Sequence, residues 1–351
     1  MTALRRFVPL WVIFSLLAAC AAPTPTAAPQ TQKLRVLATT TIVGDVVSNI
    51  AGDAVELSVL LPIGADPHAF TPTPQDVAKV SQADVVFANG AGLEEFLAAL
   101  LESAGAGEKV VAVSEGIALL PGHAHSHGAE GEHSHEGEQA HEGEHTHEGE
   151  HTHEGEHTHE GEQAHEGEHT HEHEHAAGDP HTWFDPNLVM VWVENIAKTL
   201  SEKDPQNAAT YQKNAADYTA KLRELDQWIR QQVDTIPTEN RQLVTDHKAF
   251  GYFAERYGFT QVGAVLPGFS TLAEPSAQEL AALEDAIRQL GVKAIFVGTT
   301  VNPNLAQRIA DDTGVKLVFL YTGSLSEKDG PANTYLDFMR YNVNAIVEAL
   351  K

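Results

Sequence analysis

The sequence predicts an α/β protein of two lobes, each built on a parallel four-stranded sheet, with a long rigid helix joining them. Short apolar runs without polar alternation recur along the chain, and such runs suit parallel strands that are covered on both faces. Amphipathic segments with helix start signals separate these runs. Between the fourth and fifth runs lies a long stretch with helical periodicity and no strand signal.

The N-terminus indicates export. Arg5 and Arg6 precede an apolar run from Phe7 to Ala19, which is shorter than the ~20 residues that span a bilayer. The run ends at Cys20 and resembles a bacterial lipoprotein signal with its lipobox, so residues 1–20 are expected to be a signal peptide. We therefore expect a lipid anchor at Cys20 and a place at the outer face of the cytoplasmic membrane or in the periplasm. Cys20 is the only cysteine, which excludes internal disulfides and multi-cysteine zinc sites.

Two segments lack the side chains that build a core. Residues 21–32 contain no large apolar side chain, and we expect a flexible tether. Residues 123–175 repeat units such as His-Thr-His-Glu-Gly-Glu, and we expect a disordered loop that holds borderline metal cations with low specificity. Its sixteen glutamates supply most of the formal net charge of −27. This negative charge comes mainly from one segment, and nucleic acid is itself negatively charged. We therefore expect no nucleic-acid partner.

The remaining residues, roughly 265, are enough for two lobes of ordinary size. We expect an N-terminal lobe at 33–185, an inter-lobe helical segment at 186–235 and a C-terminal lobe at 236–351. Helix start signals stand at Thr73-Pro74-Gln75-Asp76 and at Glu274-Pro275-Ser276. The expected strands are Leu34–Thr39, Val55–Leu60, Asp84–Ala88, Lys109–Val113, Gln242–Thr245, Gln261–Val265, Lys293–Val297 and Lys316–Leu320.

Ala208–Val233 is the strongest helix of the inter-lobe segment. Its apolar and aromatic positions recur every three or four residues, and at ~1.5 Å per residue it would be ~39 Å long. These positions are Tyr211, Ala215, Tyr218, Leu222, Leu225 and Ile229. A rigid connection of this kind limits hinge closure, so we expect only modest domain motion when a ligand binds.

Three histidines stand outside the histidine-rich segment, namely His68, His181 and His247. The first two end the same tripeptide, Asp-Pro-His, and the third directly follows an aspartate. Ligands of open parallel sheets bind beyond the carboxyl ends of the strands, and His68 and His247 both follow expected strands. Three neutral imidazoles are a common shell for zinc and related divalent ions. We hypothesise that Asp66, Asp179 and Asp246 orient these rings by accepting their second N–H.

At these residues the chain resembles the metal-binding lipoproteins of bacterial zinc and manganese ABC importers, a family that includes zinc-uptake and treponemal metal-binding proteins. The resemblance covers nearly all of residues 34–351. The segments that carry it run from Leu61 to His68, from Thr73 to Asp76, from Asp179 to Pro186 and from Asp246 to Tyr252. It implies two Rossmann-like lobes bridged by a long helix, and His68, His181 and His247 as metal ligands. It also implies a permease and its ATPase as partners, and a monomer.

One position departs from the family pattern. Gly323 stands where the family usually carries a fourth, carboxylate ligand, so the fourth position would fall to water or to Glu327 or Asp329 nearby. Without that carboxylate the site lacks a hard oxygen that manganese favours. We therefore expect Zn²⁺ as the transported ligand, with Mn²⁺ as the alternative. Affinity should fall as the pH drops below ~6.5, because imidazoles bind metal only when neutral.

Two other classes of function remain open. A zinc metalloenzyme also uses three histidines with an open position, but no His-Glu-x-x-His helix and no Gly-x-Ser-x-Gly elbow occurs, so we expect no enzyme activity. In a surface metal buffer or adhesin, the histidine-rich segment would itself be the functional part.

Overall fold

The computed structural model describes residues 33–121 and 178–351, and the described residues from Leu34 onward belong to one compact unit. The signal and tether expected at residues 1–32 and the histidine-rich segment expected at 123–175 lie outside the described residues. Within the described ranges, no helix combines the length and the apolar character that crossing a membrane requires.

The described chain contains two four-stranded sheets, and every strand pairing in them is parallel. The strand orders are β2-β1-β3-β4 and β6-β5-β7-β8, so each sheet has the same relative order. The first sheet consists of β1 (Leu34–Ala38), β2 (Val55–Val59), β3 (Val85–Ala88) and β4 (Val110–Ala112). The second consists of β5 (Gln242–Thr245), β6 (Thr260–Ala264), β7 (Ala294–Gly298) and β8 (Lys316–Leu320).

All eight expected strands are therefore confirmed, with ends that differ by at most one residue. The central strands β3 and β7 are buried at every position, as expected for strands covered on both faces. The edge strands β2 and β8 contain exposed residues, because one side of each has no neighbouring strand. The two-lobed α/β fold predicted from the sequence is confirmed.

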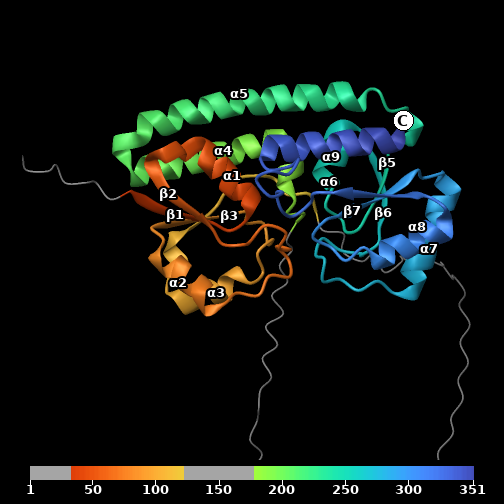
Figure 1. Ribbon diagram of the computed structural model, residues 1–351, viewed down its shortest axis with the longest axis horizontal. Helices are drawn as coiled ribbons and strands as arrows, with labels where there is room; N and C mark the ends of the chain where they lie inside the picture. The colour runs from red at the N-terminus through yellow and green to blue at the C-terminus, as the bar shows by residue number, and fades with distance from the viewer. Residues whose placement is uncertain (1–32, 122–177) are drawn as a thin grey trace, which may run out of the picture. The chain divides into compact units, whose positions relative to one another are not determined.

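Helices cover both faces of each sheet (Figure 1). On one side α1, α4, α5 and α9 form a layer, and α5 contacts α4, α1 and α9. On the other side α2 and α3 cover the first sheet, and α7 and α8 cover the second. The helices are α1 (Thr41–Ala51), α2 (Pro74–Gln82), α3 (Leu97–Ala104), α4 (Pro186–Lys203), α5 (Ala208–Val233), α6 (Gly251–Tyr257), α7 (Ala277–Leu290), α8 (Asn304–Thr313) and α9 (Tyr335–Leu350).

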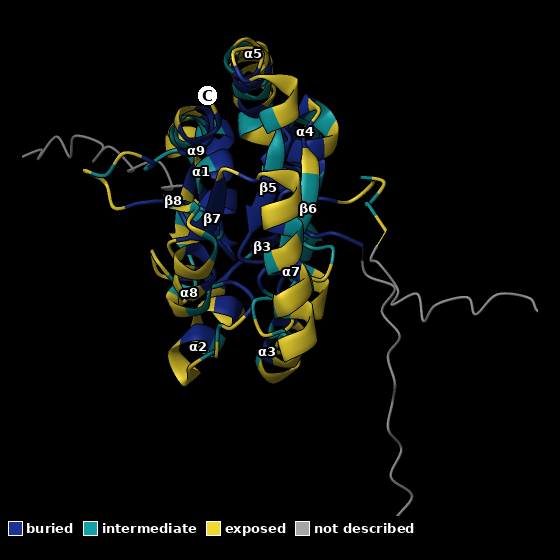
Figure 2. Cartoon of the chain, turned by 90° about the vertical axis from the view of Figure 1, so that its right-hand side faces the viewer, coloured by how far each residue is buried: buried dark blue, intermediate teal, exposed yellow. Residues whose placement is uncertain are grey.

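One hydrophobic core runs through both lobes beneath α5. It joins Val36 of the first sheet to Leu243 of the second through Leu222 of α5 and Ile346 of α9. Figure 2 shows buried positions on the strands and on the helix faces that meet them, and exposed positions along α7. Of the apolar positions expected in α5, only Ala215 is partly exposed, and the others are buried. Because the two lobes share this core, the position of one sheet relative to the other is fixed by packing.

A partly buried carboxylate also ties the first lobe to the last helix. Asp45 of α1 accepts the first backbone N–H of α9, from Tyr335, at 3.0 Å. Burial raises the pKa of Asp45 to about 6, although this hydrogen bond lowers it. Since the pKa of an unfolded aspartate is ~3.9, the folded state loses stability as the pH rises from about 4 to about 6. Above that window the cost of the buried charge stays constant.

We expect Asp45→Asn to stabilise the protein above pH 6, because an amide oxygen can accept the same N–H without a buried charge. The gain in the free energy of unfolding should be on the order of 1–2 kcal/mol at pH 7.5 and close to zero at pH 4. Urea unfolding at both pH values, with a chelator present, measures this difference. Asp217→Asn, at an exposed position of α5, is the control. An equal effect of Asp45→Asn at both pH values would contradict the prediction.

Candidate metal centre

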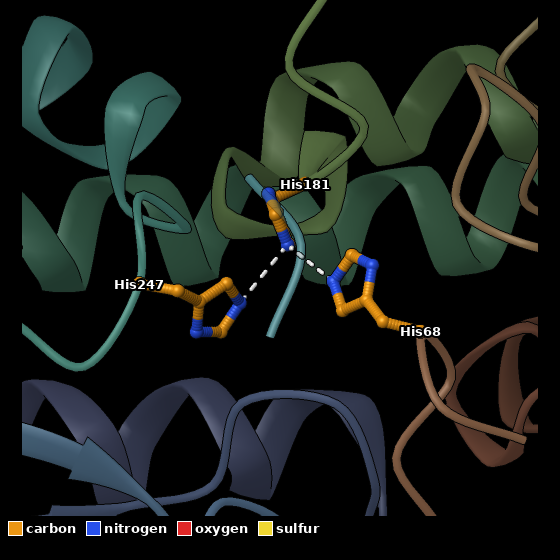
Figure 3. Close-up of side chains that lie close together, drawn as sticks. All are labelled: His68, His181 and His247. Carbon is orange, nitrogen blue, oxygen red and sulfur yellow. Dashed lines mark hydrogen bonds between the residues drawn. The ribbon is translucent and has the colours of Figure 1, made fainter. Parts of the chain in front are cut away.

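Three separate segments bring the histidines together. His68 lies between β2 and α2, His181 precedes the turn Thr182–Phe184, and His247 follows β5. Figure 3 shows the three rings turned toward one another. The Nε2 atom of His181 lies 3.2 Å from that of His68 and 3.2 Å from that of His247. One nitrogen from each ring lies within 4.8 Å of the other two, and all three residues are buried.

Two neighbouring aspartates fix the protonation of two of these rings. Nδ1 of His181 lies 2.7 Å from Oδ1 of Asp179, and Nδ1 of His247 lies 2.7 Å from Oδ1 of Asp246. Each Oδ1 also accepts the backbone N–H of its histidine, so it acts as an acceptor and Nδ1 as the donor. When His247 is neutral, both Nε2 atoms then carry a free lone pair. Buried lone pairs that face each other at this distance repel, whereas a cation between them would be bound.

The charges of the site follow from burial. Burial lowers the pKa of His68 to about 2 and that of His181 well below its usual value, and the neighbouring rings add to both effects. Burial also opposes the charged form of His247, but the Asp246 carboxylate outweighs it and raises the pKa of His247. The pKa of Asp246 is lowered despite its burial, because His247 lies beside it. His68 and His181 are therefore neutral at pH 7, as metal ligands must be.

Burial raises the pKa of Asp179 to about 7. Its second oxygen, Oδ2, has no hydrogen-bond partner among the described residues. That oxygen lies 2.5 Å from where a Cβ on Gly251 would stand, so a side chain at position 251 would push the carboxylate away from His181. The glycine therefore leaves room for the aspartate that holds the ring.

Asp66 differs from its two counterparts. Its Oδ1 accepts the backbone N–H of His68 at 3.0 Å, and its Oδ2 accepts the Thr271 hydroxyl at 2.6 Å. No hydrogen bond joins it to the His68 ring, so this structure does not contain the ring contact hypothesised from the sequence. The hydrogen bonds hypothesised for Asp179 and Asp246 are present.

The three rings border a cavity of about 10 Å³, which is close to the space that one water molecule needs. A monatomic ion fits this volume, and an organic substrate does not. The cavity is lined by Asp66, Pro67, His68, His181, Trp183, His247, Thr271, Thr300, Thr322 and Gly323.

Gly323 also lines the cavity. A Cβ at this position would stand 2.7 Å from Cδ of Pro67, so the ring of Pro67 closes the space into which a side chain would extend. Glu327 and Asp329 are exposed and do not line the cavity, and neither joins the three histidines within metal-binding distance. The structure therefore does not support the alternative in which either residue supplies the fourth ligand. The turn from Ser326 to Ala332 is closed by its own hydrogen bonds.

Several supporting residues could not be assigned from the sequence pattern. Tyr252 donates its hydroxyl to the Asp179 carbonyl at 2.7 Å and accepts the backbone N–H of Leu120 at 3.1 Å. Trp183 lies against the His181 ring, with ring centres 5.1 Å apart, and its indole N–H donates to the Thr322 carbonyl. Both residues lie in the segments that carry the family resemblance, and those segments could have indicated their role. Thr271 lies outside these segments, so nothing in the sequence pointed to it.

Comparison with known proteins identifies relatives over almost the whole chain. The family model of zinc-uptake complex component A, periplasmic (ZnuA), matches residues 36–349. The manganese-binding lipoprotein MntA of Halalkalibacterium halodurans is 32% identical over 342 residues, which is 97% of this chain and 96% of the relative. The manganese ABC transporter substrate-binding lipoprotein PsaA of Streptococcus mitis is 31% identical over 99% of both chains.

Solved structures agree with this result. The periplasmic zinc-binding protein TroA from Treponema pallidum superposes with a TM-score of 0.71 at 27% identity, covering 91% of this chain and 99% of its own. A manganese-bound periplasmic metal-binding protein from Candidatus Liberibacter asiaticus gives 0.68 at 27% identity, covering 91% of this chain and all of its own. The chain therefore belongs to the ZnuA family, the solute-binding lipoproteins of metal ABC importers, and is a metal-binding component of such an importer rather than an enzyme.

Proposed function

We propose that this chain captures one Zn²⁺ ion with His68, His181 and His247 and delivers it to its importer. The observation that best supports this is the convergence of three buried imidazoles, two of which have their Nε2 lone pairs fixed by aspartates. A substrate-binding component of an ABC importer implies a permease and an ATPase as partners. We also propose a monomer, anchored by lipid at Cys20 to the outer face of the cytoplasmic membrane.

Zinc is favoured by the donor atoms. Three imidazole nitrogens suit a borderline cation, and among the described residues no carboxylate oxygen groups with these nitrogens at metal-binding distance. Asp66, which lines the cavity, uses its oxygens to accept hydrogen bonds from His68 and Thr271. The fourth ligand in this proposal is one water molecule on the side of Gly323. The Thr300 hydroxyl lies 3.5 Å from the position of a Cβ at 323 and offers that water a partner.

We propose that residues 123–175 are an accessory store, which raises the local supply of metal and is not the carrier site. Alternating imidazoles and carboxylates bind borderline cations with low specificity, whereas a buried three-nitrogen shell is preorganised for one ion. We also propose that the N-terminal lobe comprises residues 33–185 and the C-terminal lobe residues 236–351, with the helical segment 186–235 between them.

Manganese is the second candidate, because MntA and PsaA are both named for manganese. The absence of a side chain at Gly323 argues for zinc over manganese in this chain. We expect zinc to bind at least about a hundredfold more tightly than manganese, since nitrogen donors follow the order in which Zn²⁺ exceeds Mn²⁺. Competitive titration of the two metals measures the ratio, and a ratio near one would favour the manganese function.

We expect the chain from Lys33, with residues 123–175 deleted, to bind one zinc ion tightly. His181→Ala should weaken that site by about a hundredfold or more, because one of three metal–nitrogen bonds is lost. Competition with a chromophoric zinc chelator measures both affinities, and His247→Ala is an independent second ligand variant. If the deleted form has no tight site, the histidine-rich segment holds the metal and the surface-buffer function is favoured.

Asp246→Asn should weaken zinc binding about 10- to 100-fold, the usual cost of losing a carboxylate that supports a ligating histidine. The physical reason is that the Asp246 carboxylate fixes the tautomer of His247 and places a negative charge beside the His247 ring. The same chelator competition measures the loss. Asp84→Asn is the matched control, because Asp84 pairs with Arg35 on the first sheet and lies outside the cavity. Equal affinities for the Asp246 variant and the unchanged chain would refute this role.

A further inference from the structure

A hydrogen bond crosses from one lobe to the other at the edge of the metal cavity. The Thr271 hydroxyl donates to Oδ2 of Asp66 at 2.6 Å, although 205 positions separate the two residues. Both line the metal cavity, and both also line an adjoining groove of about 330 Å³. The bond therefore stands where the cavity meets the groove.

Thr271 belongs to a loop, residues 266–273, that is attached beside His247. The backbone N–H of Leu266 donates to the Asp246 carbonyl at 2.7 Å, and that of Lys248 donates to the Gly268 carbonyl at 3.0 Å. Phe269 of this loop lies near the His181 ring, with ring centres 6.4 Å apart. The loop thus begins beside His247, passes His181 and carries Thr271, which contacts Asp66 of the opposite lobe.

His68 is the histidine that depends on this contact. The rings of His181 and His247 are each held by a carboxylate, whereas no carboxylate holds the His68 ring among the described residues. His68 is held instead at its backbone, because its N–H donates to Oδ1 of Asp66. Because the same carboxylate accepts Thr271, the position of His68 is tied to the opposite lobe through one side chain.

We propose that Thr271 and Asp66 form a clasp across the cavity edge, which holds His68 in the metal site and limits the rate at which metal leaves. The proposal rests on the proposed function, in which the three histidines bind the ion. Opening the clasp frees the loop of His68 and exposes the cavity to the groove. Thr271 is a positioning residue in this proposal, since it acts through Asp66 and does not touch the ion.

The test is the rate of zinc release from the full chain, followed in a stopped-flow instrument after mixing with excess chromophoric chelator. A His247→Ala chain serves as the blank, because zinc that it releases comes from the histidine-rich segment. Thr271→Val removes only the hydroxyl and should accelerate release about tenfold, as expected for a hydrogen bond to a charged group. Thr271→Ser keeps the hydroxyl and should release zinc as slowly as the unchanged chain.

Thr299→Val is the matched control, because Thr299 is exposed and does not line the cavity, and it should leave the release rate unchanged. Asp66→Ala should accelerate release by at least as much as Thr271→Val. Adding Thr271→Val to Asp66→Ala should then produce no further acceleration, because the hydrogen bond is already lost. Agreement of these variants would support the clasp.

The clasp is overturned if Thr271→Val releases zinc at the unchanged rate, if Thr271→Ser is as fast as Thr271→Val, or if the two changes multiply in the double variant. A failure of the proposed function has a different signature. In that case the unchanged chain and the His247→Ala blank release the same amount of zinc with the same kinetics, before any clasp variant is considered.

Discussion

The constraint on which this structure depends is the placement of three imidazole nitrogens around one small buried point. His181 stands at the centre of the three, 3.2 Å from each neighbouring Nε2. When His181 and His247 are both neutral, their facing Nε2 lone pairs repel unless a cation lies between them, and burial makes protonation of His68 and His181 costly. The surrounding chain must therefore supply the rigidity that holds the rings in place. Asp179 and Asp246 fix two tautomers, and Tyr252 fixes the backbone that carries Asp179.

The same constraint explains why the lobes share a core. His68 comes from the segment after β2 of the first sheet and His247 from the segment after β5 of the second, so their distance depends on how the sheets are held. The continuous core beneath α5, and the hydrogen bond from the first N–H of α9 to Asp45, resist a change in that arrangement. Local movement of loops costs less than movement of a packed core. Metal exchange by loop motion at the cavity edge is thus compatible with the modest domain motion expected from the long helix.

Sequence patterns predicted the strands and the three histidines because both depend on local chemistry. Apolar runs mark buried parallel strands, and the repeated Asp-Pro-His marks two loops built in the same way. In both tripeptides the aspartate accepts the backbone N–H of its histidine, which is a local interaction. Only Asp179 also reaches its ring. The second oxygen of Asp66 is taken by Thr271, and a partner so distant in the chain leaves no trace in local sequence. The exposed positions of Glu327 and Asp329 depend likewise on how one turn closes on itself.

With glycine at position 323, no carboxylate from this position can balance the charge of a bound ion. A carboxylate bound to the metal neutralises part of the positive charge of the ion. The bond between that carboxylate and the metal must then break when the ion is released. With three neutral imidazoles, the balancing charge stands one residue further out. Asp246 keeps a lowered pKa beside its histidine, and it acts on the ion only through the ring between them. Electrostatic attraction weakens with distance, so in the proposed function the ion is bound mainly by nitrogen donors. On that proposal the shell selects zinc by its donor atoms, and retention of the ion depends more on how firmly the loops hold the rings than on direct contact with an anion.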